Sequence, residues 1–384
     1  MNLFEIAKKY EQKNIRNRYI TNAHILPFLK SLPSEFNLNI EGQSVLNKNI
    51  YSLKIGSGVN KIFVWSQMHG NESTTTKAII DFLAFLNSNE PEAVKILKNV
   101  TLYIIPILNP DGAKAYTRVN ANEVDLNRDS VDLSQPESQI LRKCFDDFKP
   151  DFAFNMHDQR TLFAAGNSNN SATISFLAPA YNVATDINAV RSTAMQIICE
   201  MYDEVSKIIP NQIGRFDDAF NLNCIGDRFT NLGVSTILFE AGHFPKDYER
   251  EISRKIVFVS LLKAVCTIQS KDYIKREILD YLKIPENQKS INDILIKSVK
   301  VKINDEIEVR NLGIQYKEVL IDEQISFIPY LDEELIKNHQ FGHLELDGPD
   351  NEITTEVKIC DLLNEMNLLR AENGVYDVKY LLKY

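Results

Sequence analysis

The sequence lacks three features that would each point to a function: paired cysteines, basic runs and long apolar runs. Its five cysteines are scattered over 384 residues without a Cys-x-x-Cys pair, which argues against a disulfide framework and a thiolate zinc site. A formal net charge of −9, with no strongly basic stretch, disfavours a nucleic acid partner. No apolar run approaches the length that crosses a bilayer. These absences exclude partners, but they select no substrate.

The first ten residues lack the apolar region and the small-residue cleavage site of a signal peptide. They are charged and amphipathic, which favours a first helix of a cytoplasmic protein. The sequence does not indicate an oligomeric state.

Strand-like and helix-like patterns alternate between about residues 50 and 268, which is typical of an α/β sheet with helices packed on it. Before residue 50 we expect an initial helix, an irregular stretch and an edge strand. Ser134 is the expected N-terminal cap of the helix predicted over 136–148. The patterns predict strands over 50–55, 61–66, 100–108, 151–156 and 234–240, and helices over 73–86, 136–148, 186–209 and 246–269.

The pattern changes after about residue 285, where short strands dominate and helical signals are few. We therefore predict an α/β domain over residues 1–284 and a small β-rich C-terminal domain over 285–384. A short helix over 360–371 and a final strand or hairpin near Gly374 are expected at the end of the chain. The short strands are predicted over 294–303, 306–309, 319–321 and 325–329.

The tetrapeptide His69-Gly-Asn-Glu72 follows an apolar strand-like run and precedes a helix-like run. A His and a Glu three residues apart at the end of a strand can both turn onto one metal ion, and Gly70 allows a tight turn between them. Three protein ligands and one position left to water are typical of a catalytic zinc site. Histidine is scarce, with six in the chain, yet His69 and His157 both directly follow such runs.

Three further blocks follow this tetrapeptide in order. Asn109-Pro-Asp-Gly112 is a predicted turn, residues 118–128 read Arg-Val-Asn-Ala-Asn-Glu-Val-Asp-Leu-Asn-Arg, and two strand ends carry His157 and Glu240. In this order the blocks resemble the zinc carboxypeptidase family of carboxypeptidases A and B, over roughly residues 50 to 270. The resemblance implies a mixed, mostly parallel central sheet with helices on both faces.

The resemblance also implies one zinc ion per chain, held by His69, Glu72 and His157. Zinc with three protein ligands acidifies a bound water and polarises a scissile carbonyl. Glu240 matches the family's general base, which takes a proton from that water and passes it to the leaving amine. Arg118 matches the donor that stabilises negative charge on the carbonyl oxygen.

Three more residues match positions around that centre. Asn127 and Arg128 match the clamp for a terminal carboxylate, which a guanidinium fork can bind through two hydrogen bonds. Asp125 matches the position that orients His69 from behind. The resemblance therefore implies a metallocarboxypeptidase that removes C-terminal residues from peptides with a free carboxylate.

The chain departs from the family pattern in the loop before the general base, where the family has a mobile Tyr. Residues 215–228 contain no Tyr. Phe216, Asp217 or Asp218 takes that place, or Tyr181 supplies a phenol from another loop. The departure leaves the substrate class open more than it affects hydrolysis.

Two alternative functions stay open at this point. The first is a zinc deacylase of N-acyl amino acids, resembling aspartoacylase and succinylglutamate desuccinylase, which share the zinc ligands and carry a β-rich C-terminal part. The second is a non-catalytic binding module, which a lost ligand or base would favour. Asp158, directly after His157, either caps a loop or touches the substrate.

Overall fold

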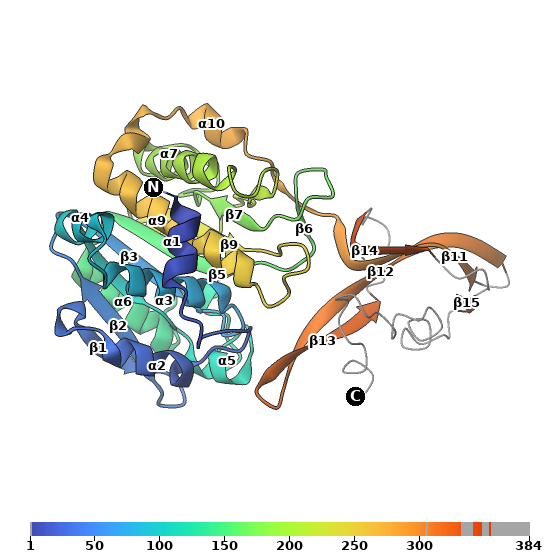
Figure 1. The fold of residues 1–384 in the computed structure, drawn as a ribbon, viewed down its shortest axis with the longest axis horizontal. Helices are drawn as coiled ribbons and strands as arrows, with labels where there is room; N and C mark the ends of the chain where they lie inside the picture. The colour runs from blue at the N-terminus through green and yellow to red at the C-terminus, as the bar shows by residue number, and fades with distance from the viewer. Residues whose placement is uncertain (1, 304–305, 332–340, 348–352, 355–384) are drawn as a thin grey trace. The chain divides into compact units, whose positions relative to one another are not determined.

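The computed structural model describes residues 2–303, 306–331, 341–347 and 353–354. These residues form two compact units (Figure 1). The first comprises residues up to 160 together with 172–287, and the second comprises residues 161–171 together with the described residues from 288 on. The sequence-based boundary assigns the loop 161–171 to the first domain, whereas its contacts place it in the second unit.

The first unit is built on one mixed sheet with the strand order β1-β2-β4-β3-β5-β9-β7-β8. The central strands β4, β3, β5 and β9 are parallel, while β1 pairs with β2, β2 with β4 and β7 with β9 in antiparallel fashion. The predicted mixed α/β fold class is therefore confirmed. The strands are β1 Leu38–Gln43, β2 Asn49–Ile55, β3 Asn60–Ser66, β4 Val100–Ile105, β5 Phe152–Asp158, β7 Ile174–Leu177, β8 Ile213–Arg215 and β9 Ser235–Ala241.

Alternation of side chains along β3 builds a core on each face of this sheet. Ile62 and Val64 join a large apolar cluster with the helices α3 (Thr74–Leu86), α7 (Ala189–Val205) and α9 (Glu251–Ser270). Phe63 and Trp65 join a second cluster with α6 (Pro136–Phe148) and α8 (Ile225–Asn231). Successive side chains of a strand point to opposite faces, so a continuous apolar run is what a sheet covered on both faces requires. Each fully buried apolar side chain contributes roughly 1.5–3 kcal/mol.

Helices cover both faces, and α1, α3 and α9 lie side by side over one of them (Figure 1). The sequence predicts α1, α3, α6, α7 and α9, but it does not predict α2, α4, α5, α8 and α10. Three short 3-10 segments, η1 Ser34–Phe36, η2 Leu126–Arg128 and η3 Asp272–Lys275, connect elements. The α-helices are α1 Leu3–Tyr10, α2 Asn22–Ser31, α3 Thr74–Leu86, α4 Pro91–Asn99, α5 Pro110–Ala115, α6 Pro136–Phe148, α7 Ala189–Val205, α8 Ile225–Asn231, α9 Glu251–Ser270 and α10 Ile278–Leu282.

Two element boundaries differ from the predicted ones for backbone reasons. Strand β4 ends before Pro106, short of the predicted residue 108, because proline cannot donate to the ladder. Helix α9 begins at Glu251 instead of Lys246. Lys246 and Arg250 have φ values of 65° and 57°, and residues in the left-handed region cannot continue a right-handed helix.

Two local predictions about turns and caps are wrong. Asn109 begins helix α5 instead of a plain turn, because its Oδ1 accepts a hydrogen bond from the Gly112 N–H at 2.8 Å. Gln135, not Ser134, is the N-cap residue of α6. The Ser134 hydroxyl instead donates to Asp129 Oδ1 at 2.7 Å.

The second unit contains a sheet in the order β13-β12-β11-β14, with β15 paired to β11, and a two-stranded sheet of β10 and β6. One continuous strand, β12, replaces the two short strands predicted over 306–309 and 319–321. The predicted helix over 360–371 and the final strand near Gly374 lie outside the described residues. The strands are β6 Phe163–Ala165, β10 Asn287–Lys289, β11 Ile291–Ile303, β12 Glu306–Ile321, β13 Gln324–Leu331, β14 Phe341–Asp347 and β15 Ile353–Thr354.

No helix within the described ranges is long and apolar enough to cross a membrane.

Candidate metal centre and active site

The candidate site lies where the parallel strands β3, β5 and β9 end. His69 and Glu72 follow β3, His157 lies near the end of β5, and Glu240 is the register partner of His157 on β9. Carboxyl ends of parallel strands meet at one edge of a sheet, which is where open α/β sheets bind ligands. Gly70 is required here by close approach, since a Cβ would lie 1.9 Å from the Gly112 carbonyl carbon.

Three buried side chains converge at this edge. His69 Nδ1 lies 2.8 Å from Glu72 Oε1, and His157 Nδ1 lies 2.8 Å from Glu72 Oε2. The two Nδ1 atoms are 3.1 Å apart. Ligands bound tetrahedrally at roughly 2.0–2.1 Å from one zinc ion are separated by roughly 3.3 Å. The donor types and their separations therefore fit one zinc ion, and the His69, Glu72 and His157 side chains could hold it.

Glu72 has the charge that a metal ligand needs. Burial disfavours its ionised form, but the imidazoles of His69 and His157 outweigh burial and hold its pKa well below the ordinary glutamate value. Metal affinity requires a deprotonated carboxylate. The same environment that brings the three side chains together thus keeps Glu72 ionised.

Asp125 and Arg118 lie behind and beside this set. Asp125 Oδ1 is 3.0 Å from His69 Nε2, so one ring nitrogen of His69 faces the carboxylate and the other faces the ligand set. Arg118 donates from Nε to Asp125 Oδ2 at 3.0 Å and from Nη1 to Glu72 Oε1 at 3.3 Å. Burial opposes ionisation of Asp125, but the contacts with His69 and Arg118 lower its pKa. This arrangement fixes the ring of His69.

Asn127 and Arg128 lie in η2, next to the start of α8. Asn127 Oδ1 accepts from the Ile225 N–H at 2.9 Å, so its amide NH₂ group is the part that can face a ligand. The exposed Arg128 donates from Nη1 to the Asn127 carbonyl at 2.7 Å and lies 3.1 Å from Cys224 Sγ. Contacts with Ile225 and Cys224 at the start of α8 therefore hold both side chains.

Glu240 combines burial with neighbouring negative charge. Burial raises the pKa of its carboxyl well above the ordinary value, and the carboxylates of Glu72 and Asp158 raise it further. The side chain nevertheless keeps partial solvent exposure. A carboxylate with a raised pKa is a better proton acceptor, which suits it to general-base chemistry.

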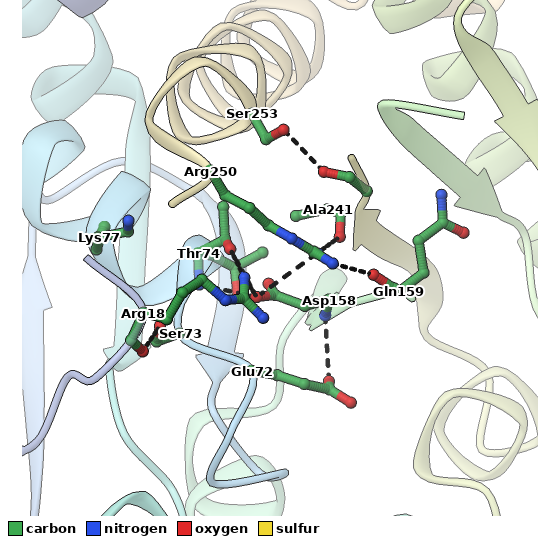
Figure 2. Close-up of polar contacts among 12 residues, drawn as sticks. Arg18, Glu72, Ser73, Thr74, Lys77, Asp158, Gln159, Ala241, Arg250 and Ser253 are labelled. Carbon is green, nitrogen blue, oxygen red and sulfur yellow. Dashed lines mark hydrogen bonds and ion pairs between the residues drawn. The ribbon is translucent and has the colours of Figure 1, made fainter. Parts of the chain in front are cut away.

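The Asp158 carboxylate contacts the start of helix α3, which favours the capping role among the two that the sequence leaves open. Its Oδ2 accepts from the Thr74 N–H at 3.0 Å, the Thr74 hydroxyl at 2.6 Å and Arg18 Nη1 at 3.1 Å (Figure 2). Its carboxylate therefore caps the start of helix α3. No motif in the sequence marks Arg18, because it lies in an irregular stretch between α1 and α2.

The loop over residues 215–228 holds its acids in structural contacts. Asp218 forms an ion pair with the buried Arg191, and Asp217 accepts a hydrogen bond from the Ala219 N–H at 2.7 Å. The backbone carbonyl of Tyr181 accepts a hydrogen bond from the Asn231 side-chain amide at 3.0 Å. These contacts do not supply a phenol at the site.

Asp227, in the first turn of α8, makes stability depend on pH. It is buried and accepts from the Asn221 N–H at 2.7 Å, and burial raises its pKa from 3.8 to about 6. Between these two values the folded state binds a proton that the unfolded state has released, so the free energy of unfolding falls as pH rises. The loss is at most about 3 kcal/mol.

We expect Asp227→Asn to remove this loss. Urea unfolding between pH 4 and 7 should show a smaller fall in stability for Asp227→Asn than for the wild type. The exposed Asp217→Asn is the matched control and should keep the wild-type slope. Equal slopes for all three proteins would contradict the assignment.

Comparison with known proteins gives a family match over part of the chain. A family model described as zinc carboxypeptidase matches residues 25–196, which include His69, Glu72 and His157 but not Glu240. Carboxypeptidase 2 of Trichophyton tonsurans is 32% identical over 111 residues, which are 28% of this chain and 20% of that protein. Carboxypeptidase M of Mus musculus is 27% identical over 154 residues, or 32% and 35% of the two chains. The chain thus spans about a fifth of the length of the fungal relatives it matches.

Solved structures of low identity share the fold. Bovine thrombin-activatable fibrinolysis inhibitor, in complex with tick carboxypeptidase inhibitor, matches with a TM-score of 0.54 and 16% identity, over 68% of this chain and 99% of that one. Carboxypeptidase A from Helicoverpa armigera matches with a TM-score of 0.52 and 15% identity, over 70% and 80%. Residues 25–196 are therefore similar to the zinc carboxypeptidase family, and the chain shares its fold with solved carboxypeptidase structures.

Proposed function

We propose that this chain is a zinc-dependent metallocarboxypeptidase, which hydrolyses the amide bond next to a free C-terminal carboxylate. The observation that carries the proposal is the convergence of His69, Glu72 and His157, whose donor atoms all lie within 4.8 Å of one another. Glu240 on the adjacent strand supplies a base at the same edge of the sheet. The donors fit zinc in number and type.

His69, Glu72 and His157 would hold the zinc ion, which when bound would supply a Lewis acid for the water and the scissile carbonyl. Glu240 takes a proton from the attacking water as the carbon–oxygen bond forms. Glu240 then returns that proton to the nitrogen as the carbon–nitrogen bond breaks, so that an amine leaves. Arg118 carries the positive charge that offsets negative charge on the carbonyl oxygen. Asp125 keeps His69 in one ring orientation.

Arg128 and the amide of Asn127 are the groups that we assign to the substrate carboxylate. An arginine fork binds a carboxylate through two charge-assisted hydrogen bonds, which are about twice as strong as neutral ones. The exposed guanidinium of Arg128 is accessible from solvent. With these two groups bound to the carboxylate, the protein should prefer peptides with a free C-terminus over peptides with an amidated one.

Arg128→Met is expected to raise KM for peptides with a free C-terminus. Loss of hydrogen bonds to a charged group costs about 1.5–3 kcal/mol, so kcat/KM should fall about ten- to 150-fold. The measurement is steady-state kinetics on one dipeptide in free and C-terminally amidated forms. Arg128→Met should narrow the difference in kcat/KM between the two forms.

The exposed Arg16→Met is the matched control and should retain the wild-type preference. Unchanged discrimination in Arg128→Met would rule out this role for Arg128.

A panel of peptides and N-acyl amino acids tests the reaction class. The proposal expects release of the last residue from peptides with free carboxylates. Turnover confined to N-acyl amino acids would replace it with a deacylase.

A further inference from the structure

A segment that lies outside the family match reaches the back of the candidate metal centre. Residues 11–21 connect α1 to α2, and the family match starts at residue 25. From this segment Arg18 enters the interior, where its side chain is 3% exposed. Burying a guanidinium is costly unless it is paired, so the partners of the Arg18 side chain must compensate for its burial.

Arg18 contacts residues that directly follow two of the metal-ligand candidates, Glu72 and His157. Its Nη1 donates to Thr74 Oγ1 at 2.9 Å and to Asp158 Oδ2 at 3.1 Å, and its carbonyl accepts from the Ser73 hydroxyl (Figure 2). Ser73 and Thr74 directly follow Glu72, and Asp158 directly follows His157. One arginine thus joins the loop after β3 to the end of β5.

Asp158 completes the link to the ligand set through its backbone. The Asp158 N–H donates to Glu72 Oε2 at 3.1 Å, and the same oxygen lies 2.8 Å from His157 Nδ1. The position of the Asp158 backbone depends on where its side chain is anchored. Arg18 anchors that side chain and therefore acts on both Glu72 and His157.

A second arginine, Arg250, lies near the same Asp158 oxygen. Arg250 Nη2 donates to the Gln159 carbonyl at 2.6 Å, and Nη1 donates to the Ala241 carbonyl. Its Nη1 lies 3.9 Å from Asp158 Oδ2. Two arginines therefore compensate the charge of the Asp158 carboxylate, and loss of Arg18 does not leave it without a neighbouring positive charge.

We propose that Arg18 is a positioning residue for the metal ligands, acting through Asp158, Ser73 and Thr74. It sets the separation of Glu72 and His157, and so it sets zinc affinity. This inference rests on the proposed function, because it presumes that the three side chains bind zinc. It assigns the N-terminal segment a part in the metal centre that no motif in the chain indicates.

Arg254 offers a matched control, because it holds the same segment without touching the metal-ligand loops. It is fully buried and donates to the Ile15 carbonyl at 2.6 Å, the Gln12 carbonyl at 3.2 Å and Asp81 at 2.6 Å. Replacing Arg254 should therefore weaken the fold and the anchoring of the segment without acting on Glu72 or His157.

The experiment compares Arg18→Lys, Arg18→Met and Arg254→Lys with the wild type. Zinc dissociation constants are measured by competition with a chromogenic chelator, and stability is measured by urea unfolding of the metal-free proteins. Substitutions behind metal ligands typically lower metal affinity ten- to a hundredfold. We expect both Arg18 variants to lose zinc affinity in that range. Arg254→Lys should lose a similar amount of stability, but its zinc affinity should stay within about threefold of the wild-type value.

Arg18→Lys keeps the charge and guards against a failure of Arg18→Met to fold. Asp158→Asn should lower zinc affinity as well, and combining it with Arg18→Met should add little, because both act on one link. Zinc affinity in Arg18→Lys equal to that in Arg254→Lys overturns the positioning role while the proposed function stands. A wild-type protein that binds no zinc overturns the proposed function itself.

Discussion

Glu240→Gln is expected to lower kcat for peptide hydrolysis by a factor of about 10² to 10⁴, the usual contribution of a general acid–base group. The amide is nearly isosteric with the carboxylate, but it cannot take a proton from water. Glu240 lies opposite His157 in the strand register, and burial beside Glu72 and Asp158 raises its pKa, which makes it a competent acceptor. Steady-state kinetics on a dipeptide with a free C-terminus measures the effect.

Two further results bear on this expectation. Zinc content of Glu240→Gln should equal that of the wild type, because Glu240 is not one of the three converging donors. The control is the same Glu-to-Gln substitution at the exposed Glu35, and Glu35→Gln should leave kcat unaltered. A Glu240→Gln protein with wild-type kcat would remove Glu240 from the mechanism.

His157→Ala is expected to abolish zinc binding at micromolar free metal, and hydrolysis with it. The substitution leaves His69 and Glu72 as ligands, and it removes the Nδ1 atom that lies 2.8 Å from Glu72 Oε2. Replacing a direct ligand should cost more affinity than the ten- to hundredfold typical of groups behind the ligands. The measurement is metal content by mass spectrometry after dialysis against buffered zinc.

Thermal unfolding supplies a second readout for His157→Ala. A ligand that binds only the folded state raises stability, so zinc should raise the wild-type Tm and leave that of His157→Ala unchanged. The exposed His24→Ala is the control and should keep the zinc-dependent rise. Full zinc occupancy in His157→Ala would contradict its assignment as a ligand.

The sequence predicts much of the candidate site because the residues proposed for it are concentrated in short blocks. His69 and Glu72 stand three residues apart after an apolar strand, and the structure brings them to within hydrogen-bond distance of His157, which is 88 residues from His69. The expected contact between Asp125 and His69 is likewise present. Apolar runs identify the central strands because a sheet covered on both faces needs side chains that are apolar throughout.

The features that escape prediction depend on single long-range contacts or on local backbone geometry. Arg18 reaches Asp158 across 140 residues of sequence from an irregular segment, and no periodicity or motif marks it. The orientation of the Asp158 side chain follows from its contact with Thr74 at the start of α3. The residues around His157 in the sequence do not indicate that contact. The late start of α9 follows from the left-handed backbone of Arg250. Such contacts are decided by tertiary packing.

The most direct test is metal content together with release of the C-terminal residue from a set of peptides that differ at that residue. The proposed function predicts one zinc per chain, hydrolysis that stops with a chelator, and recovery when zinc is restored. It also predicts loss of hydrolysis when the C-terminus is amidated. Purified protein that holds no stoichiometric zinc, or that cleaves these peptides equally well with chelator present, would contradict the zinc carboxypeptidase activity proposed for this chain.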